Sequence, residues 1–274
     1  MTGQISQHYQ QQLQREQILS RVQQTYPQGP NLYQLAPVDQ LHIGGIKASE
    51  KLLQRIEQLR PRRILDIGSG TGGLMRLLQS KLDTALVGVD ISHELNRLNR
   101  DLTALCPEQT SPRLITADAH HLPFADQQFD LILFQHSLLN MPDSRQVLSE
   151  SRRLLLSDGQ LLLHEVLAGD QPEKMRYPVP WARDAAHSHL LSEPRLRKLL
   201  QESGFELYQF DDWSAEALAW RQRQSEKEKS QQVQAAPLSP ALILGSDFSR
   251  MGANVMANLS SGAARVVEVL AQPC

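Results

Sequence analysis

The sequence predicts an α/β protein whose mostly parallel sheet is covered by helices on both faces. The first observation is a regular alternation of strand-like and helical apolar patterns over residues 63–166, which is typical of a parallel sheet. The second is the uninterrupted apolar run 131–134, because a strand buried on both faces is apolar at every position. The third is a glycine-dense turn at residues 68–73, where an apolar strand ends and a helix begins.

A helical cap is expected to precede this alternation, over residues 1–59. Residues 26–45 hold several prolines and glycines and are predicted to form a loop. A helix is expected over residues 47–59, where Pro61 ends it. The glutamine-rich start has apolar residues at helical spacing, which predict an amphipathic helix. These residues are Ile5, Tyr9, Leu13, Ile18, Leu19 and Val22.

The main domain is expected to run from residue 60 to residue 274. In its first half, Ser92 is a typical helix N-cap, and an Asp-Gly turn at 158–159 closes the last helix. The expected strands are 63–67, 84–89, 113–117, 129–134 and 160–166. The expected helices are 72–80, 92–105 and 145–156.

Beyond residue 166 the alternation is interrupted. The proline-rich residues 177–181 lie in a segment, 167–190, that is expected to form a lid. Residues 214–261 are expected to form an insertion before the last strand. The elements expected in this half are a helix at 192–203, a strand at 205–210, a polar helix at 214–229, a linker at 230–236, a helix at 247–259 and a strand at 264–270.

Composition favours a small-molecule partner. The net charge is −2 and charges of both signs are interspersed, so nothing predicts a nucleic acid or an anionic membrane as partner. No apolar stretch approaches the ~20 residues of a membrane span, and no secretory signal is visible, so we expect a cytoplasmic protein. Cys106 and Cys274 lack the spacing of a disulfide framework or a metal site, and no metal is expected. The sequence neither predicts nor excludes a homodimer.

The glycine turn predicts a nucleotide pocket but leaves the cofactor class open. Gly68, Gly70 and Gly73 fit the spacing of dinucleotide enzymes, whereas Gly68, Gly70 and Gly72 fit a tighter repeat. Asp66 ends the preceding apolar strand, where a buried carboxylate needs a partner. It would repel a pyrophosphate and attract the ammonium of an amino-acid-like cofactor. The alternative is that Asp66 only caps the turn.

Two further acids follow at the ends of the next two strands. Asp90 is placed to accept hydrogen bonds from both hydroxyls of a ribose, a feature shared by dehydrogenases and other nucleoside binders. Asp118 can accept a hydrogen bond from an adenine amino group. The three acids therefore predict successive contacts along a nucleoside.

Four motifs follow one another over roughly residues 60–166: Asp66 with its glycine turn, Asp90, Asp118-Ala119, and the strand that begins at Phe129-Asp130. In this order they resemble the motifs of class I S-adenosylmethionine-dependent methyltransferases. The resemblance implies a Rossmann-like, seven-stranded sheet of order 3-2-1-4-5-7-6 with an antiparallel seventh strand. It implies S-adenosylmethionine as cofactor and S-adenosylhomocysteine as product. The implied cofactor-binding residues are Asp66, Gly68, Ser69, Gly70, Gly72, Asp90, Ile91, Asp118, Ala119 and Gln135.

The flanking segments 35–45, 135–140 and 177–181 are similar to a small-molecule branch of that family. This branch includes quinone-type C-methyltransferases and sarcosine and dimethylglycine N-methyltransferases. The resemblance therefore implies a methyltransferase that acts on N, O or C of a small metabolite. A catalytically inactive S-adenosylmethionine-binding partner or sensor is one alternative, and an NAD-dependent oxidoreductase is another.

Methyl transfer is an in-line displacement that needs positioning more than a protein nucleophile. His136 follows the fourth strand and is the candidate general base, with a structural histidine as the alternative. His42 is a candidate for orienting the acceptor. Four other residues are candidates for acceptor contacts, each with a structural alternative such as capping, lid bonding or packing. They are Asn140, Glu165, Tyr177 and Trp181.

Overall fold

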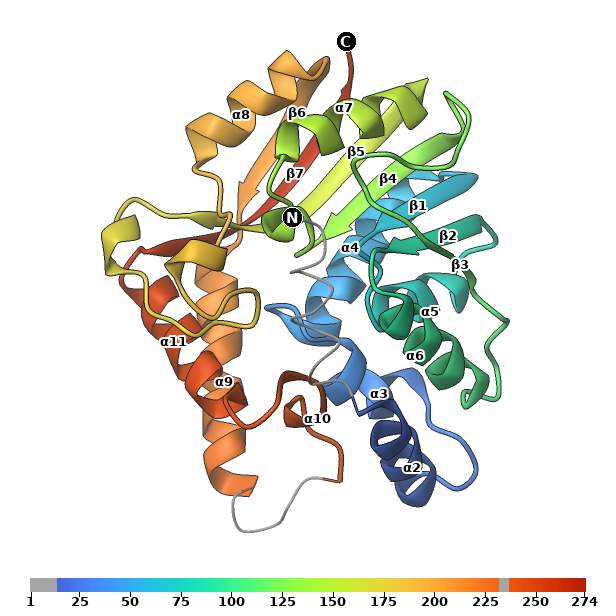
Figure 1. Ribbon diagram of the computed structural model, residues 1–274, viewed down its shortest axis with the longest axis vertical. Helices are drawn as coiled ribbons and strands as arrows, with labels where there is room; N and C mark the ends of the chain where they lie inside the picture. Colours follow the sequence, from blue (N-terminus) through green and yellow to red (C-terminus); the bar gives the residue numbers. More distant parts are fainter. Residues whose placement is uncertain (1–13, 232–236) are drawn as a thin grey trace.

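The structure, a computed structural model, describes residues 14–231 and 237–274 (Figure 1). A seven-stranded sheet has the order β3-β2-β1-β4-β5-β7-β6, in which β7 is antiparallel to both of its neighbours and the other pairs are parallel. This confirms the expected order. The strands are β1 (Arg63–Ile67), β2 (Ala85–Asp90), β3 (Arg113–Thr116), β4 (Phe129–Gln135), β5 (Leu155–Ala168), β6 (Phe205–Asp212) and β7 (Ala264–Pro273).

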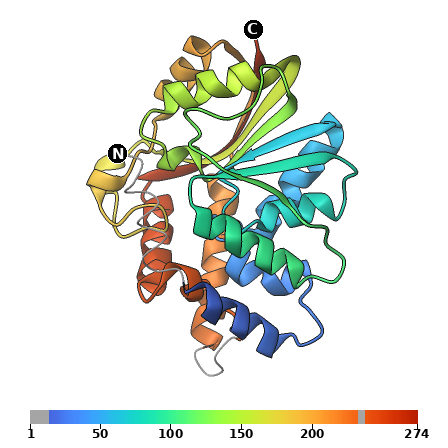
Figure 2. The ribbon, with the colours of Figure 1, turned by 45° about the vertical axis from the view of Figure 1, so that its right-hand side comes forward.

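Two layers of helices cover opposite sides of the sheet (Figures 1 and 2). The chain between β6 and β7 forms three further helices, of which α9 and α11 pack together. The helices are α2 (Arg15–Thr25), α3 (Leu32–Asp39), α4 (Gly45–Leu59), α5 (Gly73–Gln79), α6 (His93–Ala104), α7 (Ser144–Leu154), α8 (Glu193–Glu202), α9 (Ser214–Gln231), α10 (Ala241–Leu244) and α11 (Phe248–Ser260).

The continuous apolar sequence of the central strand β4 follows from its burial on both faces. Ile132 and Phe134 point into the cluster formed with α7 and α8. Leu131 and Leu133 point the other way, into the cluster formed with α4 and α5. Because successive side chains of a strand alternate between its faces, both faces must be apolar to be buried.

One predicted loop is wrong, because residues 26–45 contain the helix α3. Asn31 caps this helix: its side chain accepts a hydrogen bond from Gln34 N, and Gln34 Oε1 accepts one from Asn31 N. Such a reciprocal capping box stabilises a helix start. Leu35 and Val38 bury the inner face, and Pro37 is accommodated inside the short helix. Packing and capping thus outweigh the turn-forming composition.

The remaining boundaries differ little from the prediction. The strand expected at 160–166 is longer, because Leu155 already pairs with Phe129. The expected Asp-Gly turn at 158–159 is wrong, since these residues lie within β5, where the pairing with β4 has a register irregularity. Of the predicted amphipathic start, Ile18 and Val22 are buried in α2, whereas Ile5, Tyr9 and Leu13 lie outside the described residues. Within the described ranges, no helix has the length and apolarity that a membrane crossing requires.

Residues 169–192, between β5 and α8, pack against the helices that follow β6. Val179 and Trp181 share an apolar cluster with Trp213, which precedes α9, and with Val255 in α11. The side chain of Asn258 in α11 bonds the backbone of Arg176 at both its N–H and its carbonyl. This segment is therefore fixed beside the carboxyl edge of the sheet.

Candidate functional site

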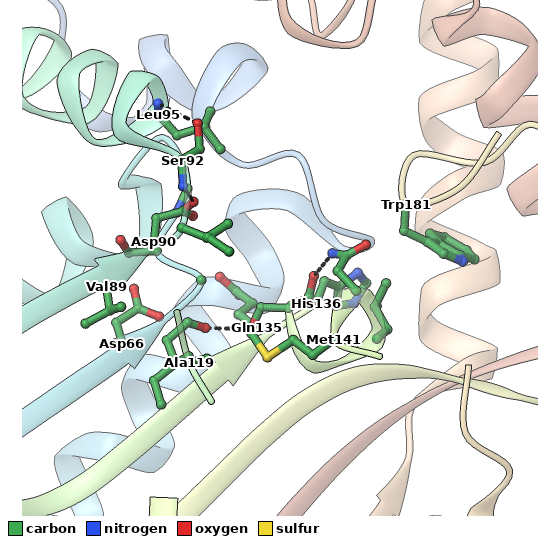
Figure 3. Close-up of a pocket in the computed structure, with 18 of the residues that line it drawn as sticks. Asp66, Val89, Asp90, Ser92, Leu95, Ala119, Gln135, His136, Met141 and Trp181 are labelled. Atoms are coloured by element: carbon green, nitrogen blue, oxygen red, sulfur yellow. Dashed lines mark hydrogen bonds between the residues drawn. The ribbon is translucent and has the colours of Figure 1, made fainter. Parts of the chain in front are cut away.

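A cavity of about 560 Å³ opens at the carboxyl edge of the parallel strands. This volume lies within the range of about 300–1,000 Å³ that is usual for small-molecule sites. Asp66, Asp90 and Asp118 line what we call the acidic end. Figure 3 shows His136 and Trp181 across the cavity from Asp66 and Asp90. We call this side, with His42, His136, Leu139 and Trp181, the histidine end.

The glycine turn after β1 uses its own amides internally. Gly68 N and Ser69 N both donate to Val89 O, at 2.7 and 3.0 Å. Gly70 N donates to Asp90 Oδ2 at 3.0 Å. These hydrogen bonds hold the turn against the end of β2. A ligand can therefore approach the backbone of the turn closely, but these amides are already used.

The three glycines of the turn serve different purposes. A side chain at Gly68 would place its Cβ 2.3 Å from Ser137 Cβ, and one at Gly72 would lie 2.0 Å from Asn99 Oδ1. Both positions must therefore be glycine for packing, and Gly72 does not line the cavity. Gly70 lines the cavity and has open space around a built Cβ. Of the predicted glycines, Gly70 alone thus combines positive φ with free space for a ligand.

Asp66 and Asp90 are buried next to each other without a cation. Burial, and then the charge of Asp90, raises the pKa of Asp66 to about 7. Burial raises the pKa of Asp90 to about 6, although the amides of Ser92 and Gly70 work in the opposite direction. No residue within 14–231 or 237–274 donates a hydrogen bond to the Asp66 carboxylate. Such a pair is stabilised by a ligand that brings donors or positive charge.

Asp118 completes the acidic end, together with Ile91 and Ala119. Its Oδ1 accepts a hydrogen bond from His120 N at 3.0 Å and contacts the His120 ring. Burial alone would raise the pKa of Asp118, but these contacts outweigh it and lower the pKa. His120 also lines the cavity. This position was not predicted, because the contact between His120 and Asp118 depends on the conformation of the loop that carries both residues.

A third buried acid, Asp39 at the end of α3, lines the same cavity but has a partner. Arg76 Nη2 donates to Asp39 Oδ2 at 2.8 Å and to Thr71 O at 2.6 Å. Arg76 Nη1 donates to Asn99 Oδ1 at 3.2 Å and to Thr103 Oγ1 at 2.8 Å. This network fastens the glycine turn to α3 and α6.

The Asp39–Arg76 pair was missed by the sequence analysis, although a signal existed. Arg76 lies in α5 among apolar residues on both sides in sequence and is 1% exposed. An arginine without a solvent-facing side must have a buried acceptor. The position of that acceptor in α3 depends on tertiary structure.

Three histidine rings pack together at the histidine end, of which His164 is buried and His42 and His136 are half-buried. The ring of His136 stacks on that of His164 with centroids 5.1 Å apart, and His42 lies edge-on to both at 5.8 and 6.3 Å. His164 comes from β5 and contacts Trp213 behind it. His164 does not line the cavity, whereas His42 and His136 do. A histidine inside the apolar run of β5 was the available sequence signal.

These histidines are neutral. Burial lowers the pKa of His42 to about 4 and that of His164 to about 3. Burial, followed by the neighbouring His164 and His42, holds the pKa of His136 well below 6.5. His136 also has a φ of +52°, and its Nε2 is buried without a partner among the described residues. Such a conformation costs about 1–3 kcal/mol and is often found at functional sites.

Gln135, at the end of β4, lines the cavity between the two ends. Its Nε2 donates to Ser49 Oγ at 3.1 Å and lies 3.1 Å from His42 Nε2. His42 Nε2 is also 3.0 Å from Gly45 O. The amide of Gln135 therefore connects the sheet edge to the segment that carries His42.

Of the predicted acceptor contacts, the structure brings Asn140 and Trp181 to the cavity but not Glu165 or Tyr177. Glu165 is buried behind the loop that follows β4, where its Oε1 accepts hydrogen bonds from Ser137 N and Leu138 N, both at 2.8 Å. Burial raises its pKa to about 7 despite these amides. Glu165 thus supports this loop, and Tyr177 packs against the apolar cluster that contains Trp181.

Residues 45–209, from α4 into β6, match the family described as a methyltransferase domain. The chain belongs to this family. The methyltransferase domain so defined contains the glycine turn, all three acids of the acidic end, and His136. The resemblance inferred from the motifs is therefore confirmed.

Curated relatives of this methyltransferase domain act on different small molecules according to their names. The chain is 30% identical over 172 residues to a sarcosine/dimethylglycine N-methyltransferase of Halorhodospira halochloris, which covers 60% of this chain and 61% of that protein. It is 32% identical over 122 residues to a demethylmenaquinone methyltransferase of Thermotoga maritima, covering 44% of this chain and 51% of the relative. The chain thus matches about half to three fifths of the length of these relatives.

A solved structure shares the fold at low identity. Phosphoethanolamine N-methyltransferase 2 of Haemonchus contortus, in complex with phosphomonomethylethanolamine and S-adenosylhomocysteine, matches with a TM-score of 0.73 and 17% identity. The match covers 93% of this chain and 59% of the Haemonchus chain. The seven-stranded methyltransferase fold is therefore shared beyond the matched family segment.

Proposed function

We propose that the protein binds S-adenosylmethionine at the acidic end and transfers its methyl group to a small molecule held at the histidine end. The observation that carries this proposal is the pair Asp66 and Asp90, two adjacent buried carboxylates without a cationic partner in the described chain. Membership of the methyltransferase family supports the same donor. The names of the relatives support a small-molecule acceptor.

The residues of the acidic end fit S-adenosylmethionine. Asp90 would accept hydrogen bonds from the ribose hydroxyls, with Asp118 at the adenine amino group and Ile91 against the adenine ring. Asp66 and the backbone at Gly70 would hold the amino-acid portion, whose ammonium gives the unpaired carboxylate a donor. When bound, this cofactor supplies an electrophilic methyl group on a sulfonium.

In the reaction, a bond forms between the acceptor nucleophile and the methyl carbon while the carbon–sulfur bond breaks. The electron pair of that bond stays on sulfur, and the proton of a protonated acceptor leaves to a base or to water. The protein contributes mainly by orientation, for which effective molarities of ~10⁵–10⁸ M are available. Leu139 and Trp181 exclude water from the histidine end.

His136 is the side chain we propose to contact the acceptor. Its ring lines the cavity and is neutral, so a ring nitrogen that faces the cavity can accept a hydrogen bond from a hydroxyl or amine. The lowered pKa of His136 makes it a weak base. It is therefore better suited to orienting the nucleophile than to accepting its proton. His42 and Asn140 are proposed to support this contact. Asn140 Nδ2 donates to His136 O at 3.5 Å, which links the two residues.

We further propose that residues 1–59 and 167–190 act as cap and lid of the main domain. His42 and Trp181 support this proposal, since each brings a side chain from one of these segments to the cavity. A cytoplasmic location and a homodimer remain predictions.

The proposal is tested by supplying S-adenosylmethionine with a deuterated methyl group to the purified protein and a small-molecule extract. We expect at least one extract component to gain a deuterated methyl group in place of hydrogen, together with formation of S-adenosylhomocysteine. Controls lack the protein or contain Asp90→Ala. A cofactor that binds but never donates its methyl group to any extract would instead indicate a binding protein or sensor.

A further inference from the structure

The wall of the cavity has no positively charged side chain. Among the residues that the structure describes, the lining includes neither lysine nor arginine. Residues 1–13 and 232–236, which are not described, contain neither residue in their sequence. Proteins bind carboxylates and phosphates in concave sites chiefly through arginine, lysine or a metal, because an unpaired buried anion is costly.

Two cations of the described chain, the buried Arg76 and the exposed Lys51, are engaged elsewhere. Arg76 pairs with Asp39 at 2.8 Å and also donates to the backbone of the glycine turn. Lys51 Nζ lies 4.8 Å from the centre of the Trp213 ring, behind His164. At the histidine end, burial keeps His42 and His136 neutral, since the pKa of each is lowered.

The charges that do line the cavity are negative. Asp66, Asp90 and Asp118 occupy the acidic end, and Asp143 lies at the start of α7, whereas the charge of Asp39 is paired with Arg76. The first two would balance the positive groups of a bound donor, so that the donor adds little attraction for an anion. A cavity lined by negative charge repels anions.

The histidine end is bounded by apolar groups. Leu139 and Trp181 belong to one apolar cluster and are 4% and 7% exposed. The cavity lining also includes other apolar side chains, among them Leu41, Met141, Pro180, Ile243 and Leu244.

We propose that the acceptor is an uncharged, largely apolar small molecule that carries one polar nucleophilic group, and that anionic acceptors are excluded. The inference rests on the proposed methyl transfer and assigns its substrate class. Apolar surface would provide the affinity, and a ring nitrogen of His136 would orient the polar group. The acceptor class therefore differs from that of the Haemonchus protein, whose bound phosphomonomethylethanolamine carries a phosphate.

A matched pair of dyes tests this proposal in protein saturated with S-adenosylhomocysteine. N-phenyl-1-naphthylamine is uncharged, and 1-anilinonaphthalene-8-sulfonate has the same rings with an added sulfonate. Fluorescence titration is expected to give a dissociation constant at least tenfold lower for the uncharged dye. Equal or tighter binding of the sulfonate, or binding of neither dye, overturns the proposal.

Three variants locate the binding. Trp181→Ala is expected to weaken the uncharged dye at least fivefold, and Leu139→Lys to raise the affinity of the sulfonate relative to the uncharged dye. Tyr208→Ala, on the exposed surface of β6, should change neither titration. An uncharged dye that responds to Tyr208→Ala but not to Trp181→Ala overturns the assignment.

Calorimetry with S-adenosylhomocysteine separates the two proposals and checks that each variant is folded. If S-adenosylhomocysteine fails to bind the unmodified protein, the proposed function fails. If it binds and the dye preference is reversed, only the acceptor class is wrong. Leu139→Lys provides the second route if Trp181→Ala does not fold.

Discussion

Two buried acids that line the same cavity, Asp39 and Asp66, differ in how their charge is neutralised. Asp39 is paired with Arg76 at 2.8 Å inside a network of hydrogen bonds. Asp66 has only another acid, Asp90, beside it. The pKa of all three acids is raised by burial, but in Asp39 the arginine opposes this rise. A raised pKa alone therefore does not mark a ligand site; the missing protein partner does.

The largest expected effect concerns the stability of the paired residues. Arg76→Met leaves Asp39 as an uncompensated buried acid, and breaking such a pair costs about 3–5 kcal/mol. Chemical denaturation should show this loss of unfolding free energy. Arg97→Met is the matched control, because the Arg97–Glu94 pair is exposed and such a pair contributes about 0–1 kcal/mol. Equal losses in both variants would remove the distinction between the pairs.

The next effect concerns cofactor affinity. Asp90→Ala removes a charged acceptor, and a hydrogen bond to a charged group is worth about 1.5–3 kcal/mol. With two ribose hydroxyls, we expect at least a ~100-fold weaker affinity for S-adenosylmethionine by calorimetry. Asp158→Ala, at an exposed position of β5, should leave the dissociation constant unchanged. An unchanged constant in Asp90→Ala would contradict the ribose contact.

Asp66→Asn tests this comparison through the pH dependence of the protein's stability. The pKa of Asp66 is raised from 3.8 to about 7, so the stabilising effect of its protonated form is complete below pH 4 and is lost as pH rises through about 7. The variant should therefore stabilise the free protein at pH 8 and stabilise it less at pH 5. A thermal melt at both pH values checks this, and destabilisation at pH 8 would contradict it.

The same substitution should weaken S-adenosylmethionine binding about 10–100-fold at pH 8, where the carboxylate is charged. In the unmodified protein, binding should strengthen from pH 6 to pH 8, because the neutral Asp66 must lose a proton to pair with the cofactor. Titrations in buffers of different ionisation enthalpy measure that proton. A pH-independent affinity would show that Asp66 does not contact the cofactor.

The smallest effect is expected at the histidine end. His136→Gln keeps a polar group but loses the ring nitrogen, and we expect kcat to fall about tenfold, roughly 1.4 kcal/mol, with the cofactor dissociation constant within about twofold. The assay uses the acceptor found by the deuterated-methyl screen. Full activity would eliminate the acceptor contact, and a matching loss of cofactor affinity would place His136 at the donor.

The sequence predicted the sheet order and most elements, because strand and helix periodicity and the family motifs are local signals. It missed α3, whose Asn31–Gln34 cap outweighs the prolines and glycines around it. It grouped Gly70 with Gly72, although Asn99 from α6 determines the second of these glycines. Such packing partners lie far apart in sequence and cannot be inferred from spacing.

The candidate site was likewise predicted where the signal is local and missed where it depends on residues far apart in sequence. Asp66, Asp90 and Asp118 were placed correctly at strand ends that line the cavity, since parallel strands bring their carboxyl ends together. Glu165 also ends a strand segment, yet it points to the amides of Ser137 and Leu138. Which face of the strand an acid occupies, and which amides lie opposite it, is decided by tertiary structure.

Calorimetric titration of the unmodified protein at pH 8 tests the central claim most directly. S-adenosylmethionine and S-adenosylhomocysteine should each bind at one site per chain, with heats that Asp90→Ala removes, and NAD should give no binding heat. Tight binding of NAD, with no response to S-adenosylmethionine or S-adenosylhomocysteine, would contradict the account.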